Sequence, residues 1–389
     1  MPTRQNKILF ILLILMCCSK HNSTNKTIGI ILKDNTVACS KYLNYYNKVN
    51  YRYLNAPDSV VVGEISNYFV TDKYQILVDS KFSRAIYLFD NNDEYLNSLS
   101  KIGGGPSEYR EIASCTIDSK REMLFVYDGY KINIYLLPDF IYKGSIRMDM
   151  LLGEIQYFNN AIYGYCISKS KDSGFLVKID LHSSKNKKEL IKEIPEIFNV
   201  IHFAGRESFC VFKNNLYFVP PVKNEILKID TADKVVREYN LKNNKLFIDC
   251  HSFLKKENIG GLREKIKSYY RSSYGFFIND SLLYLSFGIK GKIYSGFSNF
   301  SSDKLRMYCS IHTDYFNNYV WGNYVPNNLS TYIEQISPEF LQMIIDRNNS
   351  IRMNNKNKSE TIESDLIKMP KMLLKKTKNK FIPILVIYK

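Results

Sequence analysis

Short hydrophobic runs recur in pairs along the chain, and a polar link separates the two members of each pair. The clearest pairs lie in Ile76–Asp90 and Leu124–Leu137, where β-branched and aromatic residues dominate. Such runs, bounded by Asn, Asp, Gly and Ser, are typical of strands and turns. Each pair therefore predicts two adjacent strands. The weaker pairs are Tyr163–Cys166 with Phe175–Asp180, Leu216–Val219 with Ile226–Asp230, Leu282–Phe287 with Lys292–Tyr294, and Tyr319–Gly322 with Thr331–Ile333.

The strand pairs recur at an interval that is typical of one repeat architecture. Subtracting neighbouring end positions of the first strands gives intervals of 37 to 67 residues. A propeller blade needs roughly 40–50 residues. The pattern predicts an all-β fold, a six-bladed β-propeller, with a short helical insertion near residues 250–270 in the longest interval. The six end positions are Asp79, Asp128, Ser168, Pro220, Phe287 and Tyr324.

A corner rich in glycine separates the two clearest strand pairs. Three glycines permit positive φ angles and close backbone approach, and the proline that follows them prevents a ladder strand from continuing. We expect the glutamate of this corner to accept hydrogen bonds from loop amides and its tyrosine to pack between blades. The corner is thus predicted to be structural. Its residues are Gly103, Gly104, Gly105, Pro106, Glu108 and Tyr109.

The corner and the strands around it resemble a known repeat. Ile102–Ile112, with Ile117–Asp118 and Leu124–Asp128, is similar to the NHL-type repeat. More closely it resembles the six-bladed β-propeller lipoproteins of Bacteroidetes, which carry a G-x-G-P-x-E-Y corner after the first blade. The resemblance covers Tyr51 to the end of the chain. It implies a fold and a location but no reaction, because most members of that family have no assigned activity.

The two ends of the predicted propeller are expected to meet. A ring needs its last blade closed by a strand from the other terminus, since an open edge invites aggregation. The run at residues 381–388 supplies such a strand, and we expect it to pair with Tyr51–Leu54 or Val60–Gly63. Ser337 and Pro338 are typical of a helix start, and a second helix is expected at Ile362–Met369. Residues 338–369 are therefore predicted to hold the other helical insertion.

The N-terminus has the pattern of an export signal. Two basic residues precede the apolar run Ile8–Met16, which is too short for a membrane-spanning helix of ~20 residues. Cys17 and Cys18 follow at once, as in a bacterial lipobox. Cys18 is the better candidate for lipid attachment, because Cys17 would place bulky Met16 at the cleavage position. A simple signal peptide or a membrane anchor with incidental cysteines is the alternative. We predict a lipoprotein signal peptide at residues 1–18, a tether or N-terminal strap at 19–50 and the propeller at 51–389.

Charge and cysteine content add little chemistry. The formal net charge is +16, which raises the question of an anionic partner, but the basic residues are scattered over Lys/Asn-rich stretches. Binding to nucleic acid conflicts with export, and we expect none. The six remaining cysteines contain no C-x-x-C pair and are expected to be buried free thiols. They are Cys39, Cys115, Cys166, Cys210, Cys250 and Cys309.

No catalytic motif stands out in the chain. The glycine corner matches neither a Walker loop nor a dinucleotide-binding fingerprint, and no G-x-S-x-G elbow is present. Asp79 and Asp128 occupy equivalent repeat positions, so they either line the central channel as an acidic ring or cap turns. The five histidines show no metal-ligand spacing. We therefore predict no catalytic residue, no cofactor and no metal ligand. The histidines are His21, His182, His202, His251 and His312.

Together these patterns predict an exported, lipid-anchored propeller on the periplasmic face or the outer-membrane surface. It would act as a binding or interaction module for an unknown protein, peptide or glycan, and it would contact the membrane through its N-terminal lipid. The alternative is a metal-dependent propeller hydrolase, a lactonase or a lyase, with its site in the central channel. Three or more acidic or His side chains converging at the axis would favour the enzyme.

Overall fold

A computed structural model gives the conformation of most of the chain. The described residues are 26–38, 49–167, 174–181, 188–194, 208–220, 225–242, 272–289, 292–299, 302–312, 323–325, 327–329, 331, 333–343, 345–346, 371–377 and 382–388. The predicted signal peptide at residues 1–18 and the helical insertion predicted at 250–270 lie outside them. No helix among the described residues has the length and apolar character needed to span a membrane.

Three antiparallel sheets of four strands follow one another between residues 67 and 194, each with its strands in chain order. The first contains β3 (Asn67–Val70), β4 (Tyr74–Asp79), β5 (Ala85–Asp90) and β6 (Tyr95–Leu99). The second contains β7 (Ser114–Asp118), β8 (Met123–Tyr127), β9 (Lys131–Leu136) and β10 (Ile141–Arg147). The third contains β11 (Leu151–Phe158), β12 (Ala161–Ile167), β13 (Gly174–Asp180) and β14 (Lys188–Ile194). The predicted strand pairs are the second and third strands of these sheets.

A nine-stranded sheet follows, and it consists of two further four-stranded meanders joined by one strand. The first meander contains β15 (Phe209–Phe212), β16 (Asn215–Phe218), β17 (Glu225–Ile229) and β18 (Val235–Lys242). The second contains β19 (Ser272–Ile278), β20 (Leu282–Ile289), β21 (Lys292–Asn299) and β22 (Lys304–His312).

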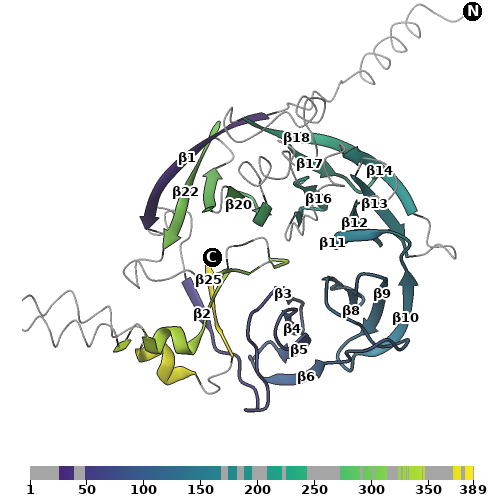
Figure 1. The fold of residues 1–389 in the computed structure, drawn as a ribbon, viewed down its shortest axis with the longest axis vertical. Coiled ribbons are helices and arrows are strands. Elements are labelled where there is room, and N and C mark those ends of the chain that lie inside the picture. The colour runs from purple at the N-terminus through teal and green to yellow at the C-terminus, as the bar shows by residue number, and fades with distance from the viewer. Residues whose placement is uncertain are drawn as a thin grey trace, which may run out of the picture.

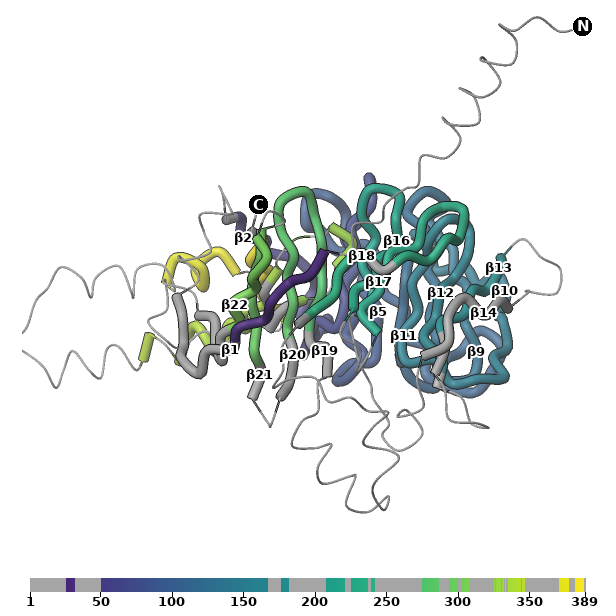
Figure 2. The backbone as a smooth tube through the Cα atoms, turned by 90° about the horizontal axis from the view of Figure 1, so that it is seen from above, coloured from purple at the N-terminus to yellow at the C-terminus, as the bar shows by residue number. Residues whose placement is uncertain are grey.

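The joining strand is β1 (Lys26–Ala38), which comes from the N-terminal segment. It runs parallel to both neighbours, with Lys26 opposite Tyr239 of β18 and Ile30 opposite Leu305 of β22. The apolar run Ile28–Leu32 lies inside β1. Part of the predicted N-terminal strap is therefore a strand on the outside of the ring, as Figures 1 and 2 show.

The last sheet combines both ends of the chain. It has the order β2–β25–β24–β23, and its strands are β2 (Val49–Arg52), β23 (Asn323–Tyr324), β24 (Ile333–Ile336) and β25 (Ile384–Tyr388). Tyr51 of β2 lies opposite Val386 of β25, so the predicted pairing of the C-terminal strand with the Tyr51 segment is confirmed. Val60–Gly63, the other predicted partner, forms no strand. The strand expected at Tyr319–Gly322 lies outside the described residues.

Two short helical segments accompany this sheet. Residues 338–343 and 345–346 are helical, and the Phe340 N–H donates to the Ser337 hydroxyl at 3.2 Å, which confirms the predicted helix start. The helix predicted at Ile362–Met369 lies outside the described residues. Residues 371–376, which were not predicted to be helical, form a further helix.

The sheets are arranged around a ring, as in a β-propeller (Figure 1). First strands such as β3 and β11 lie near the centre, and fourth strands such as β6, β10, β14, β18 and β22 lie at the periphery. The hydrophobic core fills the space between neighbouring sheets. One cluster, for example, joins Ile76 and Leu88 of the first sheet to Leu124 and Val126 of the second. The count of six blades stays a prediction.

Candidate functional site

The glycine corner is a compact loop, residues 101–112, between the first and second sheets. The Glu108 carboxylate accepts a hydrogen bond from the Gly105 N–H at 2.8 Å, as predicted. A side chain on Gly103 would collide with that carboxylate. None of the three glycines has a positive φ, so the predicted reason for them was wrong in part. The absence of a side chain at Gly103 makes room for the Glu108 carboxylate.

Tyr109 anchors the corner loop in the core. Its ring is fully buried in the cluster between the first and second sheets. Its hydroxyl donates to the Arg84 carbonyl at 2.8 Å and is 3.0 Å from the Leu99 carbonyl. Burial raises the pKa of Tyr109 to about 12. The predicted packing between blades is therefore confirmed.

Asp79 and Asp128 cap turns at equivalent positions of the first two sheets. The Asp79 carboxylate accepts from the N–H groups of Gly63 and Phe82 at 2.8 and 2.9 Å. Asp128 accepts from the N–H groups of Tyr130 and Lys131 at 3.0 and 2.9 Å. Neither aspartate lines the central hollow. Of the two readings of these residues, turn capping is the one that the contacts support.

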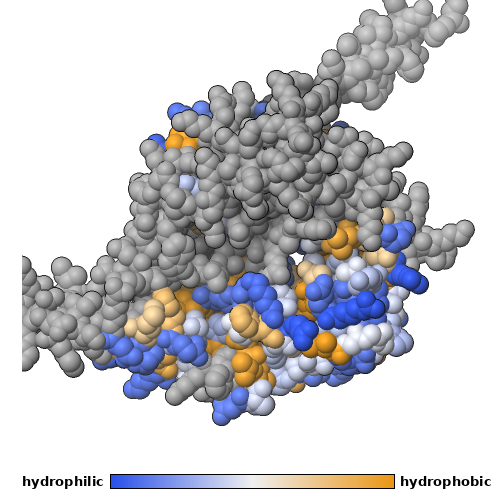
Figure 3. Space-filling view, in the orientation of Figure 1, coloured by the Kyte–Doolittle hydropathy of each residue, from blue (hydrophilic) through white to orange (hydrophobic). Residues whose placement is uncertain are grey.

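Each capped turn exposes an aromatic ring. Phe82 is 69% exposed and Tyr130 is 61% exposed. The Phe82 ring lies over Gly63, where an added Cβ would be 2.7 Å from it. On the face that Figure 3 shows, hydrophobic patches interrupt a largely hydrophilic described surface. The Arg110 guanidinium lies 4.4 Å from the centre of the Tyr130 ring, within the range of a cation–π contact. The ring and the cation thus form one surface feature.

The two turns and the corner loop share one side of the ring, which we call the corner face. The Arg84 carbonyl of the β4–β5 turn accepts from Tyr109, and the Lys131 ammonium donates to the Gly105 carbonyl at 2.8 Å. The loop therefore lies between the Phe82 turn and the Tyr130 turn. Through the corner loop, the Phe82 turn and the Tyr130 turn lie on the same side of the ring. Phe82 and Lys131, in these two turns, are 49 positions apart in the chain.

The opposite side of the ring, which we call the seam face, is closed by contacts between neighbouring sheets. Its turns connect the first and second strands or the third and fourth strands of each sheet. The contacts are Lys73–Glu122 at 2.8 Å, Arg121–Asn160 at 2.7 Å, Asn159–Thr231 at 2.8 Å, Lys213–Asp280, and Asn328 with the Val70 N–H and carbonyl at 2.8 and 2.7 Å. The polar side chains in these contacts are therefore engaged within the protein.

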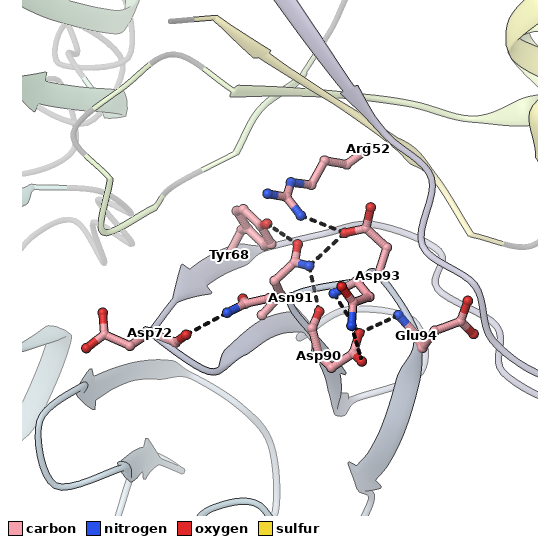
Figure 4. A network of polar contacts seen from close by, with 9 residues as sticks. Arg52, Tyr68, Asp72, Asp90, Asn91, Asp93 and Glu94 are labelled. Atoms are coloured by element: carbon pink, nitrogen blue, oxygen red, sulfur yellow. Dashed lines mark hydrogen bonds and ion pairs between the residues drawn. The ribbon is translucent and has the colours of Figure 1, made fainter.

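Two aspartates of the seam face have equivalent roles. Asp93 has a φ of 69° in the β5–β6 turn and accepts from Arg52 of the last sheet and from Gln75, both at 2.7 Å (Figure 4). Asp233 has a φ of 62° in the β17–β18 turn and accepts from Tyr163 and Lys178 of the third sheet. Each connects its own sheet to the neighbouring one. Asp93 and Asp233 thus have a structural role.

A hollow lies at the centre of the ring, where strands of successive sheets converge. It encloses about 830 Å³ of empty space, part of which is open to solvent. Its wall includes Ser80, from the turn that carries Phe82, and Ile112, which ends the corner loop. The hollow therefore reaches the corner face, and it extends toward the seam face as well, where Asn328 contacts Val70. Polar wall residues are Ser66, Asn67, Ser80, Ser114, Glu154, Gln156, Asn327 and Asn328.

Glu154 is the one carboxylate of this wall among the described residues. Its Oε2 accepts from the Ser208 N–H at 2.7 Å. The Ser208 hydroxyl beside it is buried and has no hydrogen-bond partner among the described residues. A single carboxylate among hydroxyl and amide groups suits hydrogen-bonded binding better than paired acid–base chemistry.

Cys115 and Cys210 also line the hollow. Burial raises the pKa of the Cys115 thiol well above its usual value, which removes the thiolate that nucleophilic chemistry needs. Cys115, Cys166 and Cys210 are buried free thiols, as predicted. The side chains of Cys39, Cys250 and Cys309 lie outside the described part of the chain, as do Cys17 and Cys18, the candidates for lipid attachment.

The described residues give no support to a channel metal. No group of three or more His, Cys, Asp or Glu side chains among them is placed to hold an ion. All five histidine side chains lie outside the described set. The hydrolase alternative therefore gains no observation from the described residues.

Sequence reasoning predicted a central channel but not the residues that line the hollow, and it missed the exposed aromatic rings. Residues from distant repeats form the hollow, and no pattern in a single chain shows which of them face the axis. Phe82 and Tyr130 carried a signal: each lies two or three residues after an aspartate at an equivalent repeat position. Both rings could have been predicted from this pattern, in which a large hydrophobic residue lies in a turn capped by aspartate and not in a strand.

Comparisons with known proteins place the chain in a family and support the fold. The model of a domain of unknown function, DUF4934, matches residues 29–389. A crystal structure of a Bacteroides fragilis protein described as exported has a TM-score of 0.68 and 16% identity, with 93% of this chain and 99% of that chain covered. No curated protein matches the chain.

Two weaker likenesses are to a member of the DUF4221 family from Bacteroides vulgatus and to a β-propeller domain of Cps50 (Swd1) from Myceliophthora thermophila. Their TM-scores are 0.44 and 0.37, and each is 11% identical to this chain. The match to the DUF4221 protein covers 65% of this chain and 84% of that protein. The match to the Cps50 domain covers 66% of this chain and 73% of that domain.

Proposed function

The chain belongs to the DUF4934 family of domains of unknown function, and we propose that it is a binding module whose ligand site lies on the corner face. One observation carries this proposal: two equivalent turns expose Phe82 and Tyr130 on the side of the ring where Ser80 and Ile112 form one end of the central hollow. Exposed aromatic rings beside a concave, polar-lined site are typical of ligand-binding surfaces.

The contrast between the two faces supports the choice of side. On the seam face, charged and amide side chains are paired across neighbouring sheets, as in Lys73–Glu122 and Arg121–Asn160. On the corner face, the rings of Phe82 and Tyr130 are directed to solvent at the cost of exposed apolar area. Function tends to reside in loops that a rigid scaffold positions, and the corner loop is one of these.

The proposal also covers the location of the protein. It is an exported lipoprotein with lipid on Cys18, or on Cys17, and its propeller has six blades. The basic and apolar pattern before Cys17 supports export, as does the description of the Bacteroides fragilis protein as exported. The six end positions of the predicted strand pairs support the blade count.

A ligand screen with matched variants tests the site. Purified protein is applied to an array of oligosaccharides and peptides, together with Phe82→Ala, Tyr130→Ala and two controls, Leu96→Ala and Ile141→Ala. The controls also remove exposed apolar side chains, from β6 and β10. Ligands retained by the wild type and the controls but lost by the corner-face variants are the expected result. Equal retention by all five proteins would place the site elsewhere.

A further inference from the structure

We propose that the corner face recognises an anionic polysaccharide through three cations, Arg84, Lys101 and Arg110. The inference deepens the proposed function and rests on it, because it names the class of ligand for that face. All three side chains are exposed, and none of them forms an ion pair with another described residue. They therefore present three positive charges outside any ion pair of the described residues.

The main chains of the three cations are held at one buried residue, Tyr109. Its hydroxyl binds the Arg84 carbonyl at 2.8 Å, and its N–H donates to the Lys101 carbonyl at 2.9 Å. Arg110 is the next residue in the chain. Because Tyr109 is fully buried between two sheets, the three positions are fixed relative to one another before any ligand arrives. Such preorganisation lowers the entropic cost of binding.

The acidic residues nearby are mostly engaged elsewhere. The Glu108 carboxylate is turned inward, where it accepts from the Gly105 N–H at 2.8 Å. Glu64 pairs with Lys81. The Asp79 and Asp128 carboxylates are buried in their turns and accept main-chain N–H groups. Glu111 is exposed and unpaired within the described residues, and it offsets one of the three positive charges. Among the exposed charges of this face that form no described ion pair, three are positive and one is negative, which favours an anion.

The aromatic rings favour a sugar polymer over other anions. Arg110 lies over the face of Tyr130, which holds its guanidinium in place and leaves N–H groups at its edge for a carboxylate or sulfate. The exposed Phe82 ring lies over Gly63, in the turn that also holds Arg84. Rings on two successive repeats offer flat apolar surface at two places along a chain of sugar units. The wall of the adjoining hollow offers hydroxyl and amide groups to sugar hydroxyls.

Binding to polygalacturonate provides the test. The affinity of the full protein is measured for polygalacturonate, for neutral dextran and for poly-glutamate, at two salt concentrations. The test variant is Arg84→Gln with Lys101→Gln and Arg110→Gln. The control variant is Lys120→Gln with Lys234→Gln and Lys304→Gln, which removes the same formal charge from exposed lysines outside the corner face. Thermal melting of both variants verifies that they are folded.

The wild type should bind polygalacturonate, more weakly at higher salt, because the contacts are between charged groups. The test variant should lose at least about tenfold in affinity, as expected when charge-assisted hydrogen bonds are removed. The control variant should lose much less. Tyr130→Ala should weaken binding as well, because the stacked arginine loses its support.

Three results would overturn the inference. Equal losses in the two variants would show a general effect of net charge. Tight binding of poly-glutamate that does not depend on Tyr130 would identify an acidic peptide as the ligand. Binding of neutral dextran that depends on Phe82 and Tyr130 but not on the cations would retain the binding module and reject the anionic ligand. Failure of this inference is therefore distinguishable from failure of the proposed function.

Discussion

The Glu108 carboxylate fills the space that a side chain on Gly103 would need. This relationship, rather than a special backbone angle, explains the first glycine of the corner. A methyl group at Gly103 must displace the carboxylate and break its bond to the Gly105 N–H. Gly104, in contrast, has nothing within 4 Å of the position of an added Cβ. Gly103 therefore has no room for a side chain, whereas Gly104 does.

Gly103→Ala should therefore lower the free energy of unfolding by about 0.5–1.5 kcal/mol, the net contribution of the hydrogen bond between the half-buried Glu108 carboxylate and the Gly105 N–H. Gly104→Ala is the matched control and should be nearly neutral. Urea denaturation of both variants provides the measurement. In the double variant Gly103→Ala with Glu108→Ala, the two losses should not add, because both remove the same contact. Additive losses would contradict the steric explanation.

Tyr109 predicts a dependence of stability on alkaline pH. Its pKa in the folded protein is about 12, above the unfolded value of about 10. Folding therefore favours the protonated phenol: this contribution is complete below pH 10 and is lost as the pH rises from 10 to 12. Urea denaturation of wild type at pH 9 and 11 should show the loss. Tyr109→Phe should be less stable at pH 9 but less sensitive to the change, and an unchanged sensitivity would assign the effect to other groups.

Two substitutions of Asp93 distinguish the contribution of its ion pair with Arg52 to stability from the contribution of its positive φ angle. Asp93→Asn keeps a residue that tolerates its φ of 69° but loses the ion pair. It should cost no more than about 1 kcal/mol, because the pair is partly exposed. Asp93→Ala should cost more, since alanine adopts a positive φ poorly. Equal melting temperatures for the two variants would show that the turn geometry contributes nothing.

Phe82 and Tyr130 should be dispensable for folding. Replacing either ring by alanine should change the free energy of unfolding by at most about 0.5 kcal/mol, as expected for exposed side chains. Phe69→Ala, which removes a buried ring of β3, is the contrasting control and should cost about 3–5 kcal/mol. Chemical denaturation distinguishes these cases. A large loss at Phe82 would mean that its ring serves the core and not a ligand.

Lipid attachment predicts a difference between two adjacent cysteines. Cys18→Ala should abolish incorporation of radiolabelled palmitate in cells, whereas Cys17→Ala should retain it. The reason is that Cys18 has a small residue before it and Cys17 has the bulky Met16. Membrane fractionation should follow the label. Retention of label in Cys18→Ala and its loss in Cys17→Ala would assign the lipid to Cys17 instead.

The sequence allowed the ring to be predicted because its strands have strong, local patterns. The second and third strands of each sheet are buried on both faces, so runs such as Ile76–Asp79 and Leu124–Tyr127 are nearly all hydrophobic. First and fourth strands are shorter or alternate with polar residues, as in β6 and β10, and were not predicted individually. The closure by β25 was predicted because a ring requires it.

Features that depend on distant partners were not predictable in the same way. The parallel position of β1 between β18 and β22 follows from the fold of residues more than 200 positions away. The role of Gly103 depends on where the Glu108 side chain turns. The candidate site needs the juxtaposition of Arg84, Lys101 and Arg110, which only the contacts of Tyr109 reveal.

The parallel strand β1 has a mechanical consequence. A tension applied at its N-terminal end would act along the strand axis, where the hydrogen bonds to β18 and β22 would bear it together in shear. A peripheral strand pulled at right angles would instead separate one bond at a time. If lipid holds the residues before Lys26, β1 transmits the load of the tether to two meanders at once, and the ring is held at a position suited to resist force.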